Sequence, residues 1–321
     1  EQKEKSKEKK QIQGTLSSDK KIWAVVQSEL QEIDEKFRDK RRTKIKTIEL
    51  VEYNPEDFIE HEDAYLVISK NGWLRKFKTV VEPNTLKYKE NDSLLAAVKA
   101  NTREFVAFFT SRGMVYVFKL YNLTYTRTGF GEPIQNLFKF SDGEKVVSVL
   151  SLDPAELAAT TKLLTGKTSK KPSRQTRLSF ADGENSGLEG MIVGSSGYGF
   201  RFTLTSLIET TRSGRKLMTL KNDDKLVGFS LVTGDHLFMA SISGKGIVIP
   251  VEQVALLTGA GMGSRLMKMT NSSLAGFKVV NKNDHSTITL EDEKIKKINI
   301  KDIRVTNRGG QGVIISKRKK I

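Results

Sequence analysis

Basic residues stand beside glycines in four loops of this 321-residue chain, and this pairing is its strongest chemical signal. Arginine and lysine next to glycine let guanidinium, ammonium and backbone N–H groups approach phosphate oxygens closely without demanding a base sequence. The loops are Arg127–Gly131, Arg212–Lys216, Gly259–Arg265 and Asn307–Gly312. A single basic loop is usually only solvated. Four of them on one side of an array would form a positive track.

Three of these loops follow a glycine-centred turn at a nearly constant distance, which indicates a repeat. The separation is 16 residues from Gly113 to Gly129, 17 from Gly197 to Gly214, and 17 from Gly246 to Gly263. A further turn at Gly72 lies 41 residues before Gly113. A period of roughly 40 to 50 residues made of strands and turns predicts a propeller-like array, whose units bury their faces against one another.

Alternating and apolar runs place the strands of this array. The clearest hairpin joins Tyr65–Ile68 to Trp73–Phe77, and the alternation in the second run predicts a half-exposed strand carrying Arg75. A fifth unit is implied by Ser286–Leu290 and by the residues from Ile295 onward. The expected fold is therefore all-β with five units, and residues 251–257 are the one helical candidate within it. The other expected strands are Phe105–Phe109, Met114–Phe118, Met191–Val193, Leu237–Ala240 and Ile247–Ile249.

Sequence patterns alone divide the chain into four segments. Residues 1–17 lack an apolar period and are expected to be flexible, and residues 18–43 form a helix that is followed by a linker over 44–62. The helix has one apolar face, made of Ile22, Val26, Leu30, Ile33 and Phe37, which needs a partner. The β-domain spans 63–321.

A basic insertion over residues 153–188 interrupts the β-domain because strand patterning is missing there. It carries Lys162, Lys167, Lys170, Lys171, Arg174 and Arg177 without an acidic residue between Glu156 and Asp182. Two interpretations stay open, a solvated surface loop and an auxiliary arm that binds phosphates.

The bulk composition favours a polyanionic partner. The net charge is +16, and nucleic acid is the commonest polyanion, with a membrane surface second. No apolar run is long enough to span a membrane and no signal peptide opens the chain, so we expect a soluble, cytoplasmic protein. The absence of cysteine excludes disulfides, thiol nucleophiles and cysteine-based zinc sites.

Two glycine motifs resemble nucleotide-binding sequences, but each lacks a feature that nucleotide binding requires. Thr165–Thr168 resembles the end of a phosphate-binding P-loop, but Thr161 stands where that motif needs a glycine. Gly259–Gly263 resembles a dinucleotide fingerprint, yet a strand-like segment follows it where a helix is required.

Side chains that could catalyse a reaction or bind a metal are scattered. His61, His236 and His285 are far apart in sequence and lack paired ligands at metal-binding spacing. Tyr125 lies in a basic loop and is expected to pack or stack. We therefore expect neither a catalytic residue nor a metal site.

Several of these segments resemble one known family, the C-terminal domain of the bacterial type IIA topoisomerase A subunits of gyrase and topoisomerase IV. Gln27–Thr43 resembles the final helix of the breakage-reunion core, although the family usually has glycine at the position of Arg38. Ile59–Asp63, with Leu66–Ser69 and Gly72, resembles the entry to the first blade. The resemblance implies a five-bladed β-pinwheel, a propeller-like disc whose blades exchange strands, preceded by one core helix.

The absence of a basic box from one loop favours the topoisomerase IV branch of this family. Gyrase A carries a basic box, Gln-Arg-Arg-Gly-Gly-Lys-Gly, in a loop that here reads Thr85–Ser93. The topoisomerase IV protein has sequences like Gly72–Arg75, Tyr88–Lys89, Asp92–Ser93, Ala97–Lys99, Gly131–Pro133 and Gly197–Phe200. Asn307–Gly312 resembles a degraded box, so a divergent gyrase stays open.

The resemblance implies a domain that binds and bends DNA without being an enzyme, because the catalytic tyrosine of the family lies in the core. Its implied partners are double-stranded DNA, the breakage-reunion core and the ATPase subunit, in a nucleoid-associated enzyme whose ATP and magnesium bind elsewhere. A protein-interaction module remains the alternative from another class. The expected DNA contacts are Arg75, Lys76, Lys87, Lys89, Arg127, Arg201, Arg212, Arg215, Lys216, Lys245, Arg265, Lys268 and Arg308.

Overall fold

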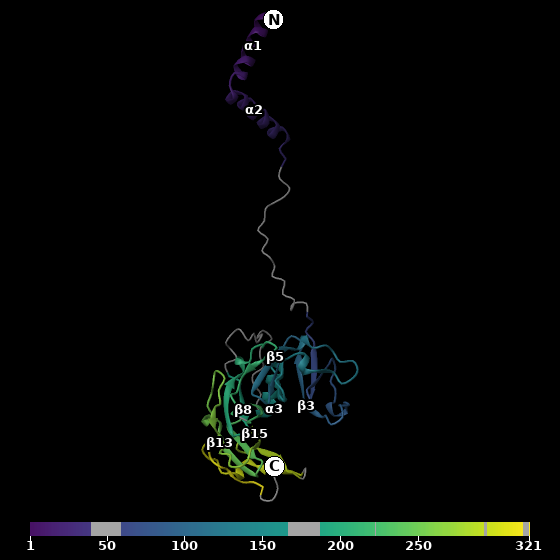
Figure 1. Cartoon of the computed structure of the whole chain (residues 1–321), viewed down its shortest axis with the longest axis vertical. Helices are drawn as coiled ribbons and strands as arrows, with labels where there is room; N and C mark the ends of the chain where they lie inside the picture. The colour runs from purple at the N-terminus through teal and green to yellow at the C-terminus, as the bar shows by residue number, and fades with distance from the viewer. Residues whose placement is uncertain (40–58, 166–186, 222, 292–293, 317–320) are drawn as a thin grey trace. The chain divides into compact units, whose positions relative to one another are not determined.

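The computed structural model describes residues 1–39, 59–165, 187–221, 223–291, 294–316 and 321. It separates into two compact units, Glu1–Tyr53 and Asn54–Ile321. The first is helical and the second is built of strands (Figure 1). The expected linker over 44–62 falls mostly outside the described residues.

The helical unit contains α1 (Gln2–Leu16) and α2 (Asp19–Phe37). The sequence assigned no helix to residues 1–17, where α1 forms. Lysine, glutamate and glutamine are good helix formers even without an apolar period, and the Lys5 amine lies 3.2 Å from the Glu1 carboxylate one turn away. Neither helix has a buried residue, and Leu30, Ile33 and Phe37 of α2 are exposed.

Among the residues that the structure describes, the β-rich unit contains four four-stranded antiparallel sheets and one two-stranded sheet. Each is built around a hairpin, whose two strands lie at the centre of the four-stranded sheets. The hairpins are β1 (Asp63–Ser69) with β2 (Trp73–Phe77), β4 (Phe105–Thr110) with β5 (Met114–Lys119), β8 (Glu189–Gly194) with β9 (Tyr198–Thr203), β12 (His236–Ser241) with β13 (Lys245–Pro250), and β16 (His285–Thr289) with β17 (Ile295–Asn299). The expectation of five β-units is confirmed, and the fifth has only its hairpin among the described residues.

A long strand flanks the first strand of each of the first four hairpins. These strands are β3 (Leu94–Asn101), β7 (Val146–Ser151), β11 (Leu226–Leu231) and β15 (Leu274–Val280). Neighbouring members of this set contact each other, β3 with β7, β7 with β11, and β11 with β15. They therefore form the inner ring of the array, and we call them the inner strands.

A two-residue strand covers the opposite edge of each complete sheet, and it always comes from the next repeat. The outer strands are β6 (Glu132–Pro133), β10 (Arg215–Lys216), β14 (Ser264–Arg265) and β18 (Val313–Ile314). For example, β6 follows the second hairpin in sequence but pairs with β2 of the first sheet, Trp73 opposite Pro133. The blades thus exchange strands, as the family resemblance implied.

The hydrophobic core is divided into clusters between consecutive units. Leu66 and Leu74 of the first unit pack with Phe108 and Phe118 of the second. Three further clusters join the second to the third unit, the third to the fourth, and the fourth to the fifth. Each unit buries its face only against its neighbours, and in Figure 1 the colours accordingly run in chain order around the unit.

Two sequence assignments, one of a candidate helix and one of a loop, need correction. Only a short 3₁₀ turn, η6 (Val251–Gln253), forms in the candidate helix over residues 251–257, and the second, third and fifth hairpins lead directly into the same kind of turn. The basic insertion starts with helix α3 (Pro154–Thr165), whose Leu157 is buried in a core cluster. The Asp153 carboxylate accepts from the N–H of Ala155 at 2.9 Å and so caps this helix. Residues 166–186 lie outside the described residues.

Candidate nucleic-acid interface

The basic loops found in the sequence lie at the outer edge of the array. Each leads into an outer strand, which is the edge of the sheet farthest from the inner ring. Arg127 precedes β6, Arg212 precedes β10, and Arg308 precedes β18, while Arg265 belongs to β14 itself. The fixed spacing in the sequence thus becomes a set of basic segments around one perimeter.

A glycine with positive φ allows each loop to dock on the preceding blade. These glycines are Gly131, Gly214, Gly263 and Gly312, with φ of 88°, 68°, 75° and 74°. A Cβ at Gly131 would overlap the carbonyl oxygen of Leu74, so the loop can approach the acceptor strand only as glycine. The turn of the fourth hairpin is at Gly244, with φ of 82°, while Gly246 lies in β13, which corrects the turn assigned from sequence.

Backbone hydrogen bonds join the perimeter segments of successive blades. The N–H of Lys139 donates to the carbonyl of Arg212 at 2.7 Å, and the N–H of Thr219 donates to Gly261 at 2.9 Å. The N–H of Lys268 completes the series by donating to Gly310 at 2.8 Å. In each case a residue that follows one outer strand binds the loop that leads to the next. These bonds join the perimeter segments into a connected belt.

Four predicted contacts, Arg127, Lys216, Lys268 and Arg308, are exposed on this belt. Two more, Arg212 and Arg265, are exposed and also oriented by hydrogen bonds. The Arg212 guanidinium donates to the carbonyls of Asn136 and Leu137, and the Arg265 guanidinium donates twice to the Tyr198 hydroxyl, at 3.1 and 2.8 Å. The N–H of Arg308 donates to the Gln253 side chain at 2.9 Å. These six residues are called the perimeter set.

The first blade presents Lys87 and Lys89, which are both exposed, in place of a basic box. The Lys89 ammonium lies 3.3 Å from the centre of the Trp73 ring and 5.8 Å from that of Phe130. A cation over an aromatic face is held there by the ring quadrupole. Lys89 is therefore partly engaged by its own blade.

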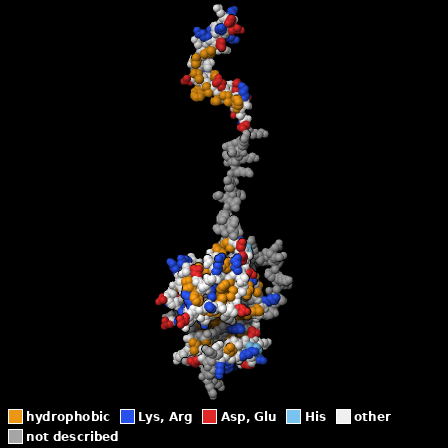
Figure 2. All heavy atoms as spheres, turned by 90° about the vertical axis from the view of Figure 1, so that its right-hand side faces the viewer, with side chains coloured by type: hydrophobic (Ala, Val, Ile, Leu, Met, Phe, Trp, Pro, Cys, Tyr) orange, Lys and Arg blue, Asp and Glu red, His pale blue; other side chains and the backbone are white. Residues whose placement is uncertain are grey.

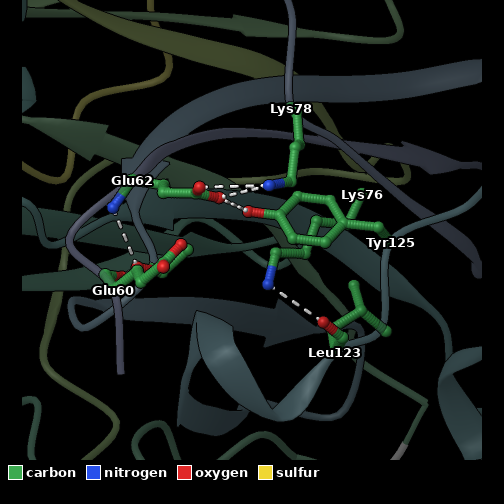
Figure 3. Close-up of polar contacts among 7 residues, drawn as sticks. Glu60, Glu62, Lys76, Lys78, Leu123 and Tyr125 are labelled. Atoms are coloured by element: carbon green, nitrogen blue, oxygen red, sulfur yellow. Dashed lines mark hydrogen bonds and ion pairs between the residues drawn. The ribbon is translucent and has the colours of Figure 1, made fainter. Parts of the chain in front are cut away.

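Arg75 and Lys76 are not on the surface, contrary to the sequence prediction. Their exposed fractions are 6% and 2%. The Arg75 guanidinium stacks on Tyr88, 5.0 Å from the ring centre. The Lys76 amine donates to the carbonyls of Leu120 and Leu123 at 2.9 and 3.0 Å, and Figure 3 shows the second of these bonds. Both are structural residues, because the loop of the next repeat covers this strand.

The surroundings of Lys76 shift several pKa values. Burial lowers the pKa of Lys76 to about 8, and Tyr125 lies over its amine at 4.3 Å. The Glu62 carboxylate accepts hydrogen bonds from Lys78 and Tyr125, which lower its pKa (Figure 3). Burial, followed by the Glu62 bond, raises the pKa of Tyr125 to about 12. Tyr125 thus packs against Lys76, as expected, and also donates a hydrogen bond to Glu62.

Three further predicted contacts are only partly accessible. Arg201 pairs with Glu189 at 2.8 Å and donates to the Val254 carbonyl at 3.0 Å. Arg215 donates to the carbonyl of Ser206, and Lys245 is half-buried beside the outer strand β18. Arg201 and Arg215 hold loops in place, so they are weaker candidates than the perimeter set.

The sequence prediction missed a basic surface on the fifth hairpin. Exposed Lys296, Lys297, Lys301 and Arg304 follow its turn. Their signal was the run from Lys294 to Lys297, which contains three lysines in four residues. Figure 2 shows basic side chains on the visible face, interspersed with acidic ones. Within the described ranges no three metal-ligating side chains cluster, and no helix there is long and apolar enough to cross a membrane.

Five consecutive β-units, of which the first four receive an outer strand from the next repeat in the described residues, define a propeller-like domain of the pinwheel type. A family model described as "DNA gyrase C-terminal domain, beta-propeller" matches residues 104–153, 191–233, 235–281 and 291–320, more than half of the chain. The chain therefore belongs to the family of C-terminal β-propeller domains of the type IIA topoisomerase A subunits.

Individual relatives come from both branches of this family. The chain is 24% identical to the DNA gyrase A subunit of Dehalogenimonas lykanthroporepellens, over 95% of its own length and 42% of the relative's. It is 26% identical to the DNA topoisomerase 4 A subunit of Salmonella typhimurium, over 86% of its length and 33% of the relative's. The chain thus spans well under half of these curated relatives.

Two solved structures share the fold. One is the C-terminal domain of DNA topoisomerase IV, with a TM-score of 0.65 and 18% identity over 82% of this chain and 77% of that one. The other is the Escherichia coli ParC C-terminal domain, with a TM-score of 0.60 and 21% identity over 80% of this chain and 95% of that one.

Proposed function

We propose that this domain binds duplex DNA along its outer perimeter and bends it, as a non-catalytic part of the topoisomerase IV protein that carries the breakage-reunion core. The observation that carries the proposal is the belt of outer strands, which holds the six basic side chains of the perimeter set on the segments that flank successive outer strands. Guanidinium and ammonium groups that are spaced along a backbone path bind phosphates without reading bases.

A duplex that follows a curved perimeter has to bend. Bending 20 to 30 base pairs costs roughly 1 to 6 kcal/mol, which phosphate contacts must offset. The perimeter set and the exposed lysines of the first loop and fifth hairpin supply these contacts. The role of such a domain is to capture a bent segment and present it to the breakage-reunion core, which favours crossed or catenated DNA.

The topoisomerase IV branch is favoured over gyrase by the first blade. Its loop offers only Lys87 and Lys89, and Lys89 lies over Trp73. Point-like ammonium groups lack the bidentate reach of paired arginines, so this blade is poorly suited to complete a full wrap. A divergent gyrase whose box has moved to the Arg308 loop is the alternative.

Salt-dependent binding tests the perimeter directly. A labelled duplex is titrated with the full chain at several salt concentrations, using wild type and a variant with Arg127, Lys216, Lys268 and Arg308 changed to alanine. Each lost phosphate contact should lower the slope of log K against log salt by about 0.9. The control changes Lys145, Lys225, Lys278 and Lys282 to alanine, exposed lysines that precede, belong to or follow the inner strands.

The two variants lose the same net charge, so they separate a defined path from general attraction. The proposal requires a clearly larger loss of affinity and slope for the perimeter variant. Equal losses of affinity and slope in the two variants would show that the positive charge attracts DNA without a defined path. Binding that does not depend on salt concentration would support the protein-interaction alternative.

A further inference from the structure

The first basic loop carries an exposed aromatic side chain that the other three loops lack. Phe130 stands directly before the positive-φ glycine that docks its loop, and the residues at this position in the later loops are Ser213, Met262 and Gln311. Phe130 is 42% exposed. The structure describes every residue of the four loops, and among them Phe130 is the one large hydrophobic residue that is exposed. The perimeter thus has one apolar contact point among its cations.

The backbone of this loop is anchored on one side of Phe130 and free on the other. The neighbouring glycines, Gly129 and Gly131, both have positive φ, of 86° and 88°. A Cβ on Gly131 would overlap the Leu74 carbonyl oxygen, whereas a Cβ on Gly129 would meet no atom within 4 Å. The next residue, Glu132, then pairs with Leu74 in the sheet. The position of Phe130 is therefore fixed relative to the first blade, at an open edge of it.

Basic side chains lie around the ring of Phe130. The Lys89 ammonium is 5.8 Å from the centre of this ring and 3.3 Å from the centre of the Trp73 ring, so a second loop of the first blade brings a cation to it. Arg127 is exposed three residues before Phe130, and Lys87 is exposed two residues before Lys89. Such cations bind backbone phosphates. A side chain held among them meets the groove that lies between the two phosphate chains of a duplex.

We propose that Phe130 inserts from the minor groove between two base pairs and fixes the point at which the duplex bends over the first blade. The inference rests on the proposed function, because it requires a duplex on the perimeter. A phenylalanine that enters a base step in this way unstacks the step partly and kinks the duplex by roughly 20–90°. Burial of the ring, together with phosphate contacts of Arg127 and Lys89, offsets the lost stacking.

Insertion gives the perimeter a sequence preference that phosphate contacts alone lack. Pyrimidine–purine steps such as TA and CA unstack more easily than other steps, so a kink costs least there. The second and fourth loops present the polar side chains of Ser213 and Gln311 at the same position, and these leave the stack intact. The bound duplex should therefore be placed in register at Phe130 and follow the remaining blades through its backbone.

A duplex with one flexible step measures insertion directly. In a duplex of about 30 base pairs, a purine tract is interrupted by a single TA step, whose adenine is replaced by a fluorescent analogue that brightens when it unstacks. The wild-type full chain should raise this fluorescence. Phe130→Ala should abolish the increase and weaken binding about three- to tenfold. Its salt slope should stay as in wild type, because no phosphate contact is lost.

Two further variants and a second duplex serve as controls. Phe130→Leu should keep part of the signal, since leucine also acts as a wedge. Ile208→Ala should behave as wild type, because Ile208 is 58% exposed but lies before the second basic loop. A duplex with a purine–purine step in place of TA should bind wild type about threefold more weakly, with no such difference for Phe130→Ala. Circular dichroism and thermal unfolding establish that the variants fold.

The outcomes separate insertion from binding along the perimeter. Unchanged fluorescence when wild type binds, or an increase that Phe130→Ala retains, would overturn the insertion. Salt-dependent binding would persist in that case, and the perimeter proposal would stand. A wild-type chain that bound no duplex would overturn both.

Discussion

Lys76 and Leu123 are joined by a buried hydrogen bond of 3.0 Å, from the amine of the first hairpin to a carbonyl of the second unit. The third and fourth units repeat it, since Arg201 donates to the Val254 carbonyl at 3.0 Å. The donors Lys76 and Arg201 each stand four residues after the turn glycine of their own hairpin. The acceptors each stand ten residues after the turn glycine of the next hairpin. The two bonds tie consecutive blades together, so these cations stabilise the array.

Replacing Lys76 by methionine should destabilise the domain. Methionine keeps the apolar length of the side chain but leaves the Leu123 carbonyl without the Lys76 donor in a buried place. The expected loss is about 1–3 kcal/mol of unfolding free energy. Urea unfolding measures it, with Lys87→Met as the control at an exposed lysine. A Lys76→Met protein as stable as the control would show that the bond contributes little.

The stability of the wild type should rise as pH increases from 8 to about 10. The folded pKa of Lys76, about 8, is below its ordinary value of 10.5, so in this window the unfolded chain binds more protons than the folded one. Unfolding free energy then increases with pH, by an amount on the order of 1–3 kcal/mol. Below pH 8 the full cost of the buried charge is present.

The comparison with Lys76→Met isolates this effect. The difference in unfolding free energy between wild type and variant should grow in favour of wild type between pH 8 and 10. Tyr125, whose pKa is raised to about 12, opposes the trend only above pH 10, where the unfolded chain loses its proton first. A difference that stays constant from pH 7 to 10 would contradict the assignment to Lys76.

Gly131→Ala should prevent the first strand exchange. Its φ of 88° disfavours any side chain, and the added Cβ would overlap the Leu74 carbonyl. Gly129→Ala is a matched control, because its φ is 86° but its Cβ would meet no atom within 4 Å. We expect about 1 kcal/mol of destabilisation for the control and several for Gly131→Ala. Similar midpoints in urea would refute the close approach.

Tyr198→Phe should weaken DNA binding without changing the number of phosphate contacts. The hydroxyl of Tyr198 orients the Arg265 guanidinium through two bonds. Removal of the hydroxyl should cost about 0.5–1.5 kcal/mol of DNA-binding free energy, because the guanidinium is no longer held in place. This corresponds to a loss of affinity of roughly two- to tenfold. The salt slope should stay as in wild type. A slope lowered by about 0.9 would mean that the contact itself is lost.

An enzyme containing this domain should relax and decatenate DNA with ATP but introduce no negative supercoils. The first blade lacks the arginine pair that would complete a wrap. Incubation of the holoenzyme with relaxed plasmid and ATP, followed by gel electrophoresis, tests this. Negatively supercoiled product would place the domain with gyrase and point to the Arg308 loop as a displaced box.

The sequence by itself determined most of the hairpin strands, the number of units and the existence of the basic loops, whereas the inner and outer strands were not predicted. Alternating apolar residues and turn glycines act over a few residues, so they can be read without the fold. Gly113, Gly197 and the loop glycines Gly214 and Gly263 all have the positive φ that such turns require. The terminal helix α2 followed from its apolar period in the same way.

Only the tertiary structure decided which blade receives each loop and which cations remain at the surface. Lys76 occupies the same position in its repeat as the buried residues Val117 and Val248. It is buried there because the next unit packs over it. Arg201 is restrained by Glu189 and Val254, the second of which lies 53 residues away along the chain. Accessibility arises from contacts between distant segments, whereas the local pattern of a strand is the same whether or not a neighbouring loop covers it.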